Sequence, residues 1–162
     1  MQGYDYSREQ LADLVRVGFI PEVPKPEAAV IFDFLAAHAD EYDRFSFSVR
    51  LGTAIVPDPT HLPAVQKSTV FSSMKRIDCI AWQGDYATIV EAKLRVNTDA
   101  IGKSLMYRQL FLEDQPHAPE PRMLVVGREV DDDVARVHSA QGIDIYLYEP
   151  GLDGGGASQR RV

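Results

Sequence analysis

Two carboxylates and one amine in the middle of the chain, Asp78, Glu91 and Lys93, are residue types that could hold a divalent cation beside a phosphate. Mg²⁺ is a hard ion that binds through one or two carboxylates and keeps its other positions for water and phosphate. Such an ion can neutralise a phosphate, activate a water and stabilise a leaving oxygen, while Lys93 could hold that water. This chemistry requires the three side chains to converge in the folded chain.

A predicted β-hairpin brings these side chains together. Residues 74–83 and 86–95 have the pattern of strands, and Gly84-Asp85 between them suits a two-residue turn. With this turn the paired positions sum to 169, as 83 and 86 do, so Asp78 lies directly opposite Glu91. Because side chains alternate between the faces of a strand, the lysine two positions after Glu91 shares its face. The hairpin therefore predicts a cluster of two acids and one lysine.

Two carboxylates with Cβ atoms about 5 Å apart repel each other unless a cation lies between them. We therefore expect Mg²⁺ or Mn²⁺ between Asp78 and Glu91. The alternative is a solvated ladder of surface charges. In that ladder Arg76 lies opposite Lys93, and the diagonal pairs of acids and bases balance.

The segments around the hairpin predict an α/β fold with a mixed central β-sheet and helices on its faces. At 162 residues the chain has room for one domain, which we predict over residues 1–150, with a flexible glycine-rich tail at 151–162. The predicted elements, in order, are a helix (7–18), a first core helix beginning at Pro26 (26–39), a half-buried strand (44–56), the two hairpin strands, a helix (97–112), a strand (123–126), a helix (130–140) and a strand (143–148).

The charge of the chain bears on its partners. A net charge of −7 argues against a protein that coats nucleic acid through phosphate contacts alone. Between Val65 and Arg108, however, seven basic residues stand against four acids. We predict that Arg95, Lys103 and Arg108 in this region contact DNA phosphates.

Other features of the sequence limit the class of protein. No apolar run approaches the roughly 18 to 20 residues that span a bilayer, and no secretion signal opens the chain, so we expect a soluble cytoplasmic protein. The single cysteine, Cys79, excludes an internal disulfide and a cysteine-rich zinc site. The four histidines lack the spacing of metal ligands.

Arg76-Ile77-Asp78 followed by Glu91-Ala92-Lys93 resembles the signature of the PD-(D/E)XK nuclease superfamily, an acid on one strand and acid-x-lysine on the next. Ile77 stands where the family name has a proline. The core of that family, the restriction-endonuclease-like αβββαβ core, is a helix, three antiparallel strands, a helix and another strand. The elements predicted over about residues 26–127 follow the same order.

The resemblance implies a nuclease that hydrolyses the phosphodiester bonds of DNA. Asp78 and Glu91 would bind Mg²⁺ or Mn²⁺, and Lys93 would assist the attacking water. It also implies a metal-binding glutamate in the first core helix, which Glu27 matches best, although an acid at this position also stabilises a helix start. Asp33 and Glu41 match that glutamate less well.

The resemblance further implies a glutamine or tyrosine on the helix after the lysine, where it touches DNA or orients the site. Tyr107 and Gln109 are in that position. The alternative to a nuclease is a non-catalytic DNA-binding or assembly protein of a phage or repair complex that retains the fold, and the acidic net charge favours it. In either case we expect DNA as a partner, together with a homo-oligomer or a larger protein complex. Sequence-specific restriction ranks below both, because the compact chain has little room for a recognition region.

Overall fold

The computed structural model describes residues 2–149 and 158–162. Within them a mixed sheet of seven strands has the order β1-β2-β3-β4-β6-β8-β9. Neighbours are antiparallel from β1 to β4 and between β8 and β9, and parallel from β4 through β6 to β8. The strands are β1 (Gln2–Ser7), β2 (Arg44–Leu51), β3 (Lys75–Gln83), β4 (Tyr86–Ala92), β6 (Arg122–Gly127), β8 (Ile143–Glu149) and β9 (Ser158–Arg161), and a separate parallel pair joins β5 (Arg95–Val96) to β7 (Glu129–Val130).

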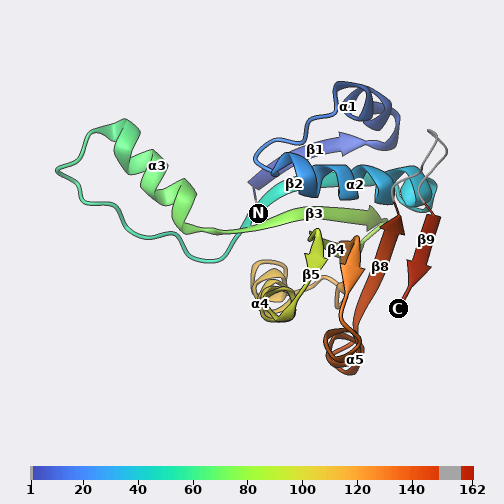
Figure 1. Ribbon diagram of the computed structural model, residues 1–162. Coiled ribbons are helices and arrows are strands. Elements are labelled where there is room, and N and C mark those ends of the chain that lie inside the picture. Colours follow the sequence, from blue (N-terminus) through green and yellow to red (C-terminus); the bar gives the residue numbers. More distant parts are fainter. Residues whose placement is uncertain (1, 150–157) are drawn as a thin grey trace.

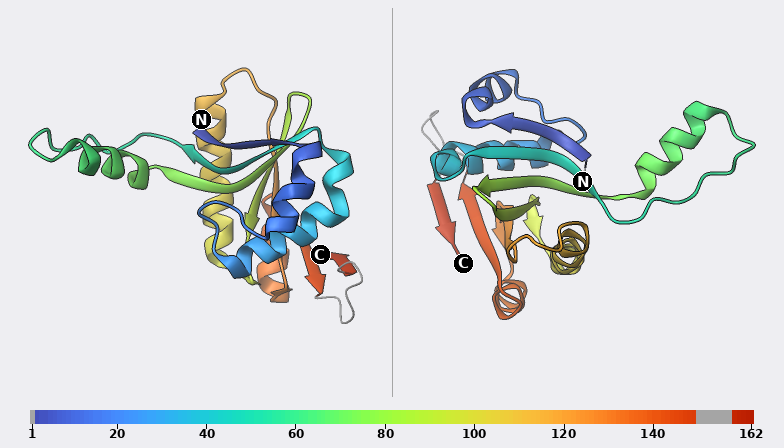
Figure 2. Two further views of the ribbon diagram at one scale, coloured as in Figure 1. Left: turned by 90° about the horizontal axis from the view of Figure 1, so that it is seen from above. Right: turned by 180° about the vertical axis from the view of Figure 1, so that it is seen from behind.

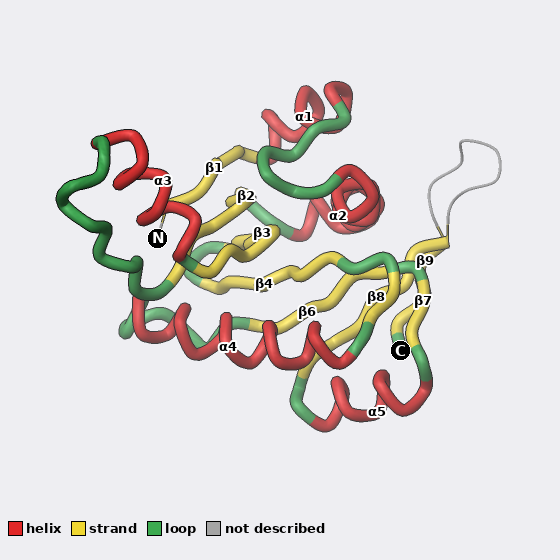
Figure 3. The backbone as a smooth tube through the Cα atoms, turned by 60° about the vertical axis from the view of Figure 1, so that its left-hand side comes forward, coloured by secondary structure: helices red, strands yellow, loops and turns green. Residues whose placement is uncertain are grey.

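Helices cover both faces of this sheet (Figures 1 and 3). α1 (Leu11–Val17) and α2 (Lys25–His38) pack on one face, while α4 (Thr98–Asp114) and α5 (Asp132–Ala140) pack on the other. Each face therefore has its own hydrophobic core. The predicted α/β fold with a mixed sheet flanked by helices is confirmed. No helix in the described part of the chain is long and apolar enough to cross a membrane.

The hairpin forms as its turn residues predict. Gly84 has φ 57°, a backbone conformation that favours glycine. The register runs from Gln83–Tyr86 to Cys79–Val90 with every pair summing to 169. Asn97 caps α4 by accepting a hydrogen bond from the amide of Ala100 at 3.3 Å. In chain order the helix α2, the strands β2, β3 and β4, the helix α4 and the strand β6 follow one another as predicted.

A strand lies within residues 44–56 as predicted, but the expectation that it is half-buried was wrong. The strand β2 ends at Leu51 and is buried on both faces. Phe45 and Phe47 lie in the core under α2, whereas Val49 and Leu51 lie in the core under α4. The residue between these pairs, Ser48, has φ 52°, which interrupts the regular alternation and exchanges the two faces.

The connection from β2 to β3 extends away from the sheet as an arm, residues 52–74, that carries α3 (Pro63–Ser73) (Figures 1 and 2). No residue of α3 is buried. None of the elements predicted from the sequence falls at residues 63–73, and this helix has no buried face that would mark it as packed on a core. The arm is joined to the body near Arg50, whose guanidinium lies 4.1 Å from the centre of the Phe71 ring.

Both ends of the described chain add strands that the sequence analysis missed. β1 precedes the predicted first helix, and that helix begins as a 3-10 turn, η1 (Arg8–Gln10). The predicted flexible tail is wrong for Ser158–Arg161, which form β9 on the free edge of β8. There Arg161 pairs with Asp144 at 2.8 Å, so edge pairing and an ion pair hold a polar segment in place. The remainder of the predicted tail, 151–157, lies outside the described residues.

Gly127 ends β6 at a point where the backbone of the residues after β4 passes very close. A Cβ atom there would lie 2.7 Å from a methyl carbon of Val96 and 2.9 Å from the carbonyl oxygen of Lys93. We predict that Gly127→Ala lowers the free energy of unfolding by about 1–3 kcal/mol, measured by urea denaturation. Gly102→Ala on α4 is the matched control. It meets no atom within 4 Å and should stabilise the helix by about 0.5–1 kcal/mol. Equal effects of the two substitutions would contradict the close approach.

Candidate active site

The hairpin presents its acids at the end where β3 begins and β4 finishes. Asp78 is on β3, Glu91 is the penultimate residue of β4, and Lys93 follows that strand directly. α2 contributes Glu27 from its first turn, and α4 contributes Lys103 one turn after its start. The site therefore lies where two helices on opposite faces both reach the same end of the hairpin.

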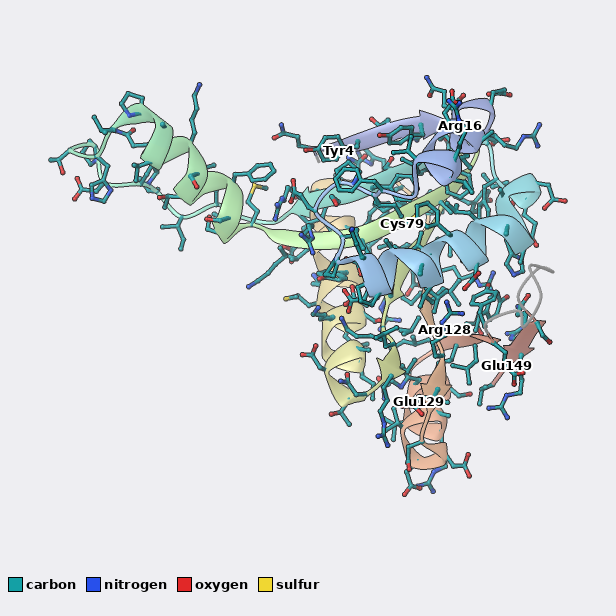
Figure 4. All side chains as sticks on the ribbon, turned by 45° about the horizontal axis from the view of Figure 1, so that its top comes forward. Tyr4, Arg16, Cys79, Arg128, Glu129 and Glu149 are labelled. Atoms are coloured by element: carbon teal, nitrogen blue, oxygen red, sulfur yellow. The ribbon has the colours of Figure 1, made fainter. Side chains whose placement is uncertain are left out.

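The recorded pairing of β3 with β4 stops at Cys79–Val90, one step before Asp78 and Glu91. Instead of a backbone pair at this step, the Asp78 carboxylate accepts a hydrogen bond from the amide of Ala92 at 3.1 Å. Only 4% of Asp78 and 1% of Glu91 are exposed. Cys79, beside Asp78, is completely buried in the core that α2 covers, and Figure 4 marks its position. The acids are thus part of the protein interior, and the alternative of a solvated charge ladder is wrong.

Burial and the neighbouring Glu91 raise the pKa of Asp78 from its ordinary value of 3.8 to about 7. The amide of Ala92 and the ammonium of Lys93 act in the opposite direction but do not overcome these effects. Near neutral pH the pair therefore resists holding two negative charges. A cation between the two carboxylates would remove that resistance.

Two lysines neutralise Glu91 on one of its oxygens. The Oε1 atom of Glu91 lies 3.0 Å from the Lys93 ammonium and 2.9 Å from the Lys103 ammonium. Its other oxygen, Oε2, is buried and has no hydrogen-bond partner among the described residues. A buried carboxylate oxygen without a partner is costly. This oxygen is available to a further ligand.

Lys93 also reaches Glu27, whose carboxylate lies 3.2 Å from its ammonium. Burial lowers the pKa of Lys93, but the charges of Glu91 and Glu27 and their hydrogen bonds outweigh it and raise the pKa above the ordinary value. Lys93 is therefore a cation in this arrangement. It is suited to holding a water or a phosphate oxygen by charge and hydrogen bond.

The donor set fits a divalent ion that is coordinated partly by solvent. Across residues 2–149 and 158–162, no three carboxylate, histidine or cysteine side chains are grouped as a ready-made metal site. Mg²⁺ needs only one or two carboxylates, with water and phosphate as its remaining ligands. Asp78 and the free oxygen of Glu91 could supply these. Glu27 could be a further metal ligand only if its ion pair with Lys93 breaks.

The five predicted DNA-contacting residues divide into two groups. Lys103 and Tyr107 face the site from α4, and the Tyr107 hydroxyl donates to the carbonyl of Arg76 at 2.7 Å. Tyr107 is buried, so it packs under the start of β3. The other three contact acids outside the cluster: Arg95 lies 3.8 Å from Glu129, Arg108 lies 3.8 Å from Glu120, and Gln109 donates to Glu113 at 2.9 Å.

The weaker matches to the helix glutamate contact residues outside the cluster. Asp33 pairs with Arg128 at 2.6 Å, and Glu41 lies 2.6 Å from a ring nitrogen of His38. Of the three acids, Glu27 is the one that joins the cluster, through Lys93.

Sequence reasoning missed a second group of charges beside Asp78. Arg76 lies 3.9 Å from Asp78 and 3.7 Å from Glu22, and Glu22 is also paired directly with Arg50. The charge ladder considered from the sequence places Arg76 opposite Lys93, although its position two residues before Asp78 on one strand could have indicated the contact with Asp78. Glu22 could not have been suspected, since it comes from a turn more than fifty positions away in the sequence.

A cavity of about 580 Å³ in the described part of the chain does not contain the acids. It lies toward the turn of the hairpin and is lined by Arg44, Trp82, Tyr86 and His117 among others. The candidate site is therefore identified by its charges and their burial, not by a cavity.

Comparisons of the chain with protein-family models, with curated proteins and with solved structures gave no match. A function must therefore be inferred from the side chains of the site and from their arrangement.

The raised pKa of Asp78 predicts how stability depends on pH. A group whose pKa is higher in the folded state stabilises the fold below its unfolded pKa, and this contribution is lost as pH rises through about 7. Asp78→Asn, which cannot ionise, should therefore melt above the parent at about pH 8 in EDTA, by about 3 °C or more, and the gap should shrink at about pH 5.

Asp144→Asn is the control of opposite sign. Burial raises the pKa of Asp144, but hydrogen bonds from Arg122 and Arg161 outweigh this effect and hold the pKa below its usual value. This substitution should therefore cost stability at neutral pH, where the carboxylate is charged. A melting temperature of Asp78→Asn that follows the parent at every pH would refute a raised Asp78 pKa.

Proposed function

We propose that the chain is a metal-dependent deoxyribonuclease of the PD-(D/E)XK type. The observation that carries this proposal is a pair of buried carboxylates, Asp78 and Glu91, at adjacent positions of a hairpin, with the charged Lys93 two residues after Glu91. The chain order of α2, β2, β3, β4, α4 and β6 is the order of the restriction-endonuclease-like core and supports the same assignment.

In this proposal Asp78 and Glu91 hold Mg²⁺ or Mn²⁺, which when bound supplies charge neutralisation of the phosphate and activation of water. Lys93 exchanges part of its contact with Glu91 for the attacking water or for a phosphate oxygen. Glu27 keeps the Lys93 ammonium at the site during that exchange, or becomes a further metal ligand. Tyr107 supports the strand that carries Asp78 through its bond to the Arg76 carbonyl.

DNA is the proposed substrate. The protein is acidic overall, but the DNA phosphates would approach it where several cations lie close together. Arg76, Lys93 and Lys103 all lie within 4.0 Å of the acids of the site. These cations, with the bound metal, offset the net charge of −7 where the phosphate must approach.

One observation favours the second candidate, a non-catalytic DNA-binding or assembly protein of a phage or repair complex. Lys93 and Lys103 both bind Glu91, so its charge is balanced without any ion. Under this alternative the lysines replace the metal permanently, and the site serves the stability of the fold.

We predict that the purified chain cleaves plasmid or linear DNA in Mg²⁺ or Mn²⁺. Asp78→Asn, Glu91→Gln and Lys93→Ala should each reduce the rate by about a hundredfold or more, the scale typical of losing an electrostatic or proton-transfer group. Arg136→Ala on α5, which removes an exposed cation far from the hairpin in sequence, should keep the parent rate. Intact DNA after incubation with the parent in both metals would favour the non-catalytic alternative.

Metal binding should separate the roles of the acids and the lysine. Calorimetry with Mn²⁺ should show binding by the parent that is lost in Asp78→Asn and in Glu91→Gln, because each removes a ligand charge. Lys93→Ala should bind Mn²⁺ at least as tightly as the parent, since it frees both Glu91 and Glu27 from their bound ammonium. Weaker Mn²⁺ binding by a folded Lys93→Ala would contradict the proposed exchange.

A further inference from the structure

Two arginines beside the acids share a single carboxylate. The Glu22 side chain pairs directly with Arg50, and its Oε2 atom lies 3.7 Å from a guanidinium nitrogen of Arg76. Arg76 in turn lies 3.9 Å from Asp78. Arg76 therefore lies between two carboxylates, Glu22 and Asp78, and immediately next to the candidate metal ligands.

Arg50 is not fully satisfied by this arrangement. Its side chain is only 9% exposed, and its Nε is buried without a hydrogen-bond partner among the described residues. Phe71 of the arm covers the guanidinium at 4.1 Å. A guanidinium presents donors in a fork that matches the oxygens of a carboxylate or a phosphate. Arg50 therefore has donor capacity that Glu22 does not use.

Glu22 occupies a backbone position that suits another residue. The amide of Val23 bonds to the carbonyl of Ile20 at 3.3 Å, which closes a turn with Pro21 and Glu22 at its centre. Glu22 has φ 63° at the third position, where such turns favour glycine. A glutamate at this position costs free energy that a glycine would not. The contacts of its carboxylate with Arg50 and Arg76 give a reason why a glutamate occupies this position.

The strain in the backbone is concentrated at this place. Across residues 2–149 and 158–162, Glu22 and Ser48 are the two non-glycine residues with positive φ. They are linked, because the Ser48 hydroxyl donates to the carbonyl of Pro21. Strained residues gather at ligand clamps and switches, where the surrounding structure holds them. Here the strained turn presents its carboxylate to both arginines.

We infer that Arg50 and Arg76 form a binding site for a backbone phosphate of DNA, and that Glu22 occupies this site as a carboxylate substitute until a phosphate displaces it. This inference rests on the proposed function, since it assigns the two arginines to a phosphate of the DNA strand that the site of Asp78 and Glu91 would cleave. The side chains of Glu22 and Arg76 are 24% and 29% exposed, so a ligand can reach the Glu22 carboxylate and the Arg76 guanidinium from solvent. The turn 20–23 acts as a gate, and affinity for DNA is lowered by competition with its carboxylate.

The test compares the affinity of variants for a short labelled DNA duplex, by fluorescence anisotropy in EDTA at several salt concentrations. Glu22→Gln keeps the size of the side chain and removes the competing charge. It should bind the duplex about tenfold more tightly than the parent, a change of about 1.4 kcal/mol. The slope of log affinity against log salt should steepen by about one for each arginine that gains a phosphate.

Asp133→Asn is the matched control, because it also removes one acid and frees one arginine, Arg136, from an ion pair at 2.7 Å on α5. It should leave affinity and salt slope nearly unchanged. The double variant Glu22→Gln with Arg76→Gln should lose the gain in affinity, which would show that the gain depends on the contact of Glu22 with Arg76. Glu22→Asp, whose shorter side chain cannot reach both arginines, should show a smaller gain in the same direction and serves as the test if Glu22→Gln does not fold.

A purely structural ion pair predicts a different result. Glu22→Gln and Glu22→Asp would then bind DNA no more tightly than Asp133→Asn and would only melt lower, and that outcome overturns the inference. Because EDTA prevents metal-dependent cleavage, the two proposals can fail separately. If Glu22→Gln gains affinity but the parent does not cleave DNA in Mg²⁺, the phosphate site is supported and the nuclease proposal is refuted. If the parent cleaves DNA but Glu22→Gln gains no affinity, the nuclease proposal is supported and the phosphate site is refuted.

Discussion

The burial of two neighbouring carboxylates determines which other charged side chains must surround them. Asp78 and Glu91 lie in the protein interior, where an uncompensated charge is expensive and where the charge of Glu91 raises the pKa of Asp78. The fold compensates them with cations from several elements: Lys93 from the hairpin itself, Lys103 from α4 and Arg76 from β3. This compensation is incomplete at the Oε2 atom of Glu91, which finds no hydrogen-bond partner in the part of the chain that the structure describes.

The change of faces at Ser48 explains how an acid comes to lie inside a regular sheet. Ser48 separates residues of β2 that pack under α2 from residues that pack under α4, and on β3 the corresponding change occurs between Ile77 and Cys79. Asp78 therefore occupies the step at which the strand changes sides. There its carboxylate accepts a hydrogen bond from the amide of Ala92, and Arg76 of the same strand lies 3.9 Å from it.

The charges of the chain are unequally distributed around this site. The net charge is −7, yet the arm of residues 52–74 contains one acid, Asp58, and one lysine, Lys67. The arm leaves the sheet directly beside Arg50 and returns to it beside Arg76. A phosphate backbone that approaches the site would therefore pass a nearly neutral projection and then a cluster of cations, which reduces the repulsion expected from the acidic chain.

The hairpin, its register and the grouping of Asp78, Glu91 and Lys93 can be predicted from the amino-acid sequence, because a Gly-Asp turn and strict alternation are local signals. The first core helix and the capped α4 can be predicted in the same way. The burial of the acids, the contact of Lys103 with Glu91 and the contacts of Glu22 with Arg50 and Arg76 become visible only in the folded chain. These contacts join residues distant in the chain, and no local pattern encodes them. The face change at Ser48 was equally hidden, since the sequence alternates regularly through it and only packing against two helices imposes the unusual backbone.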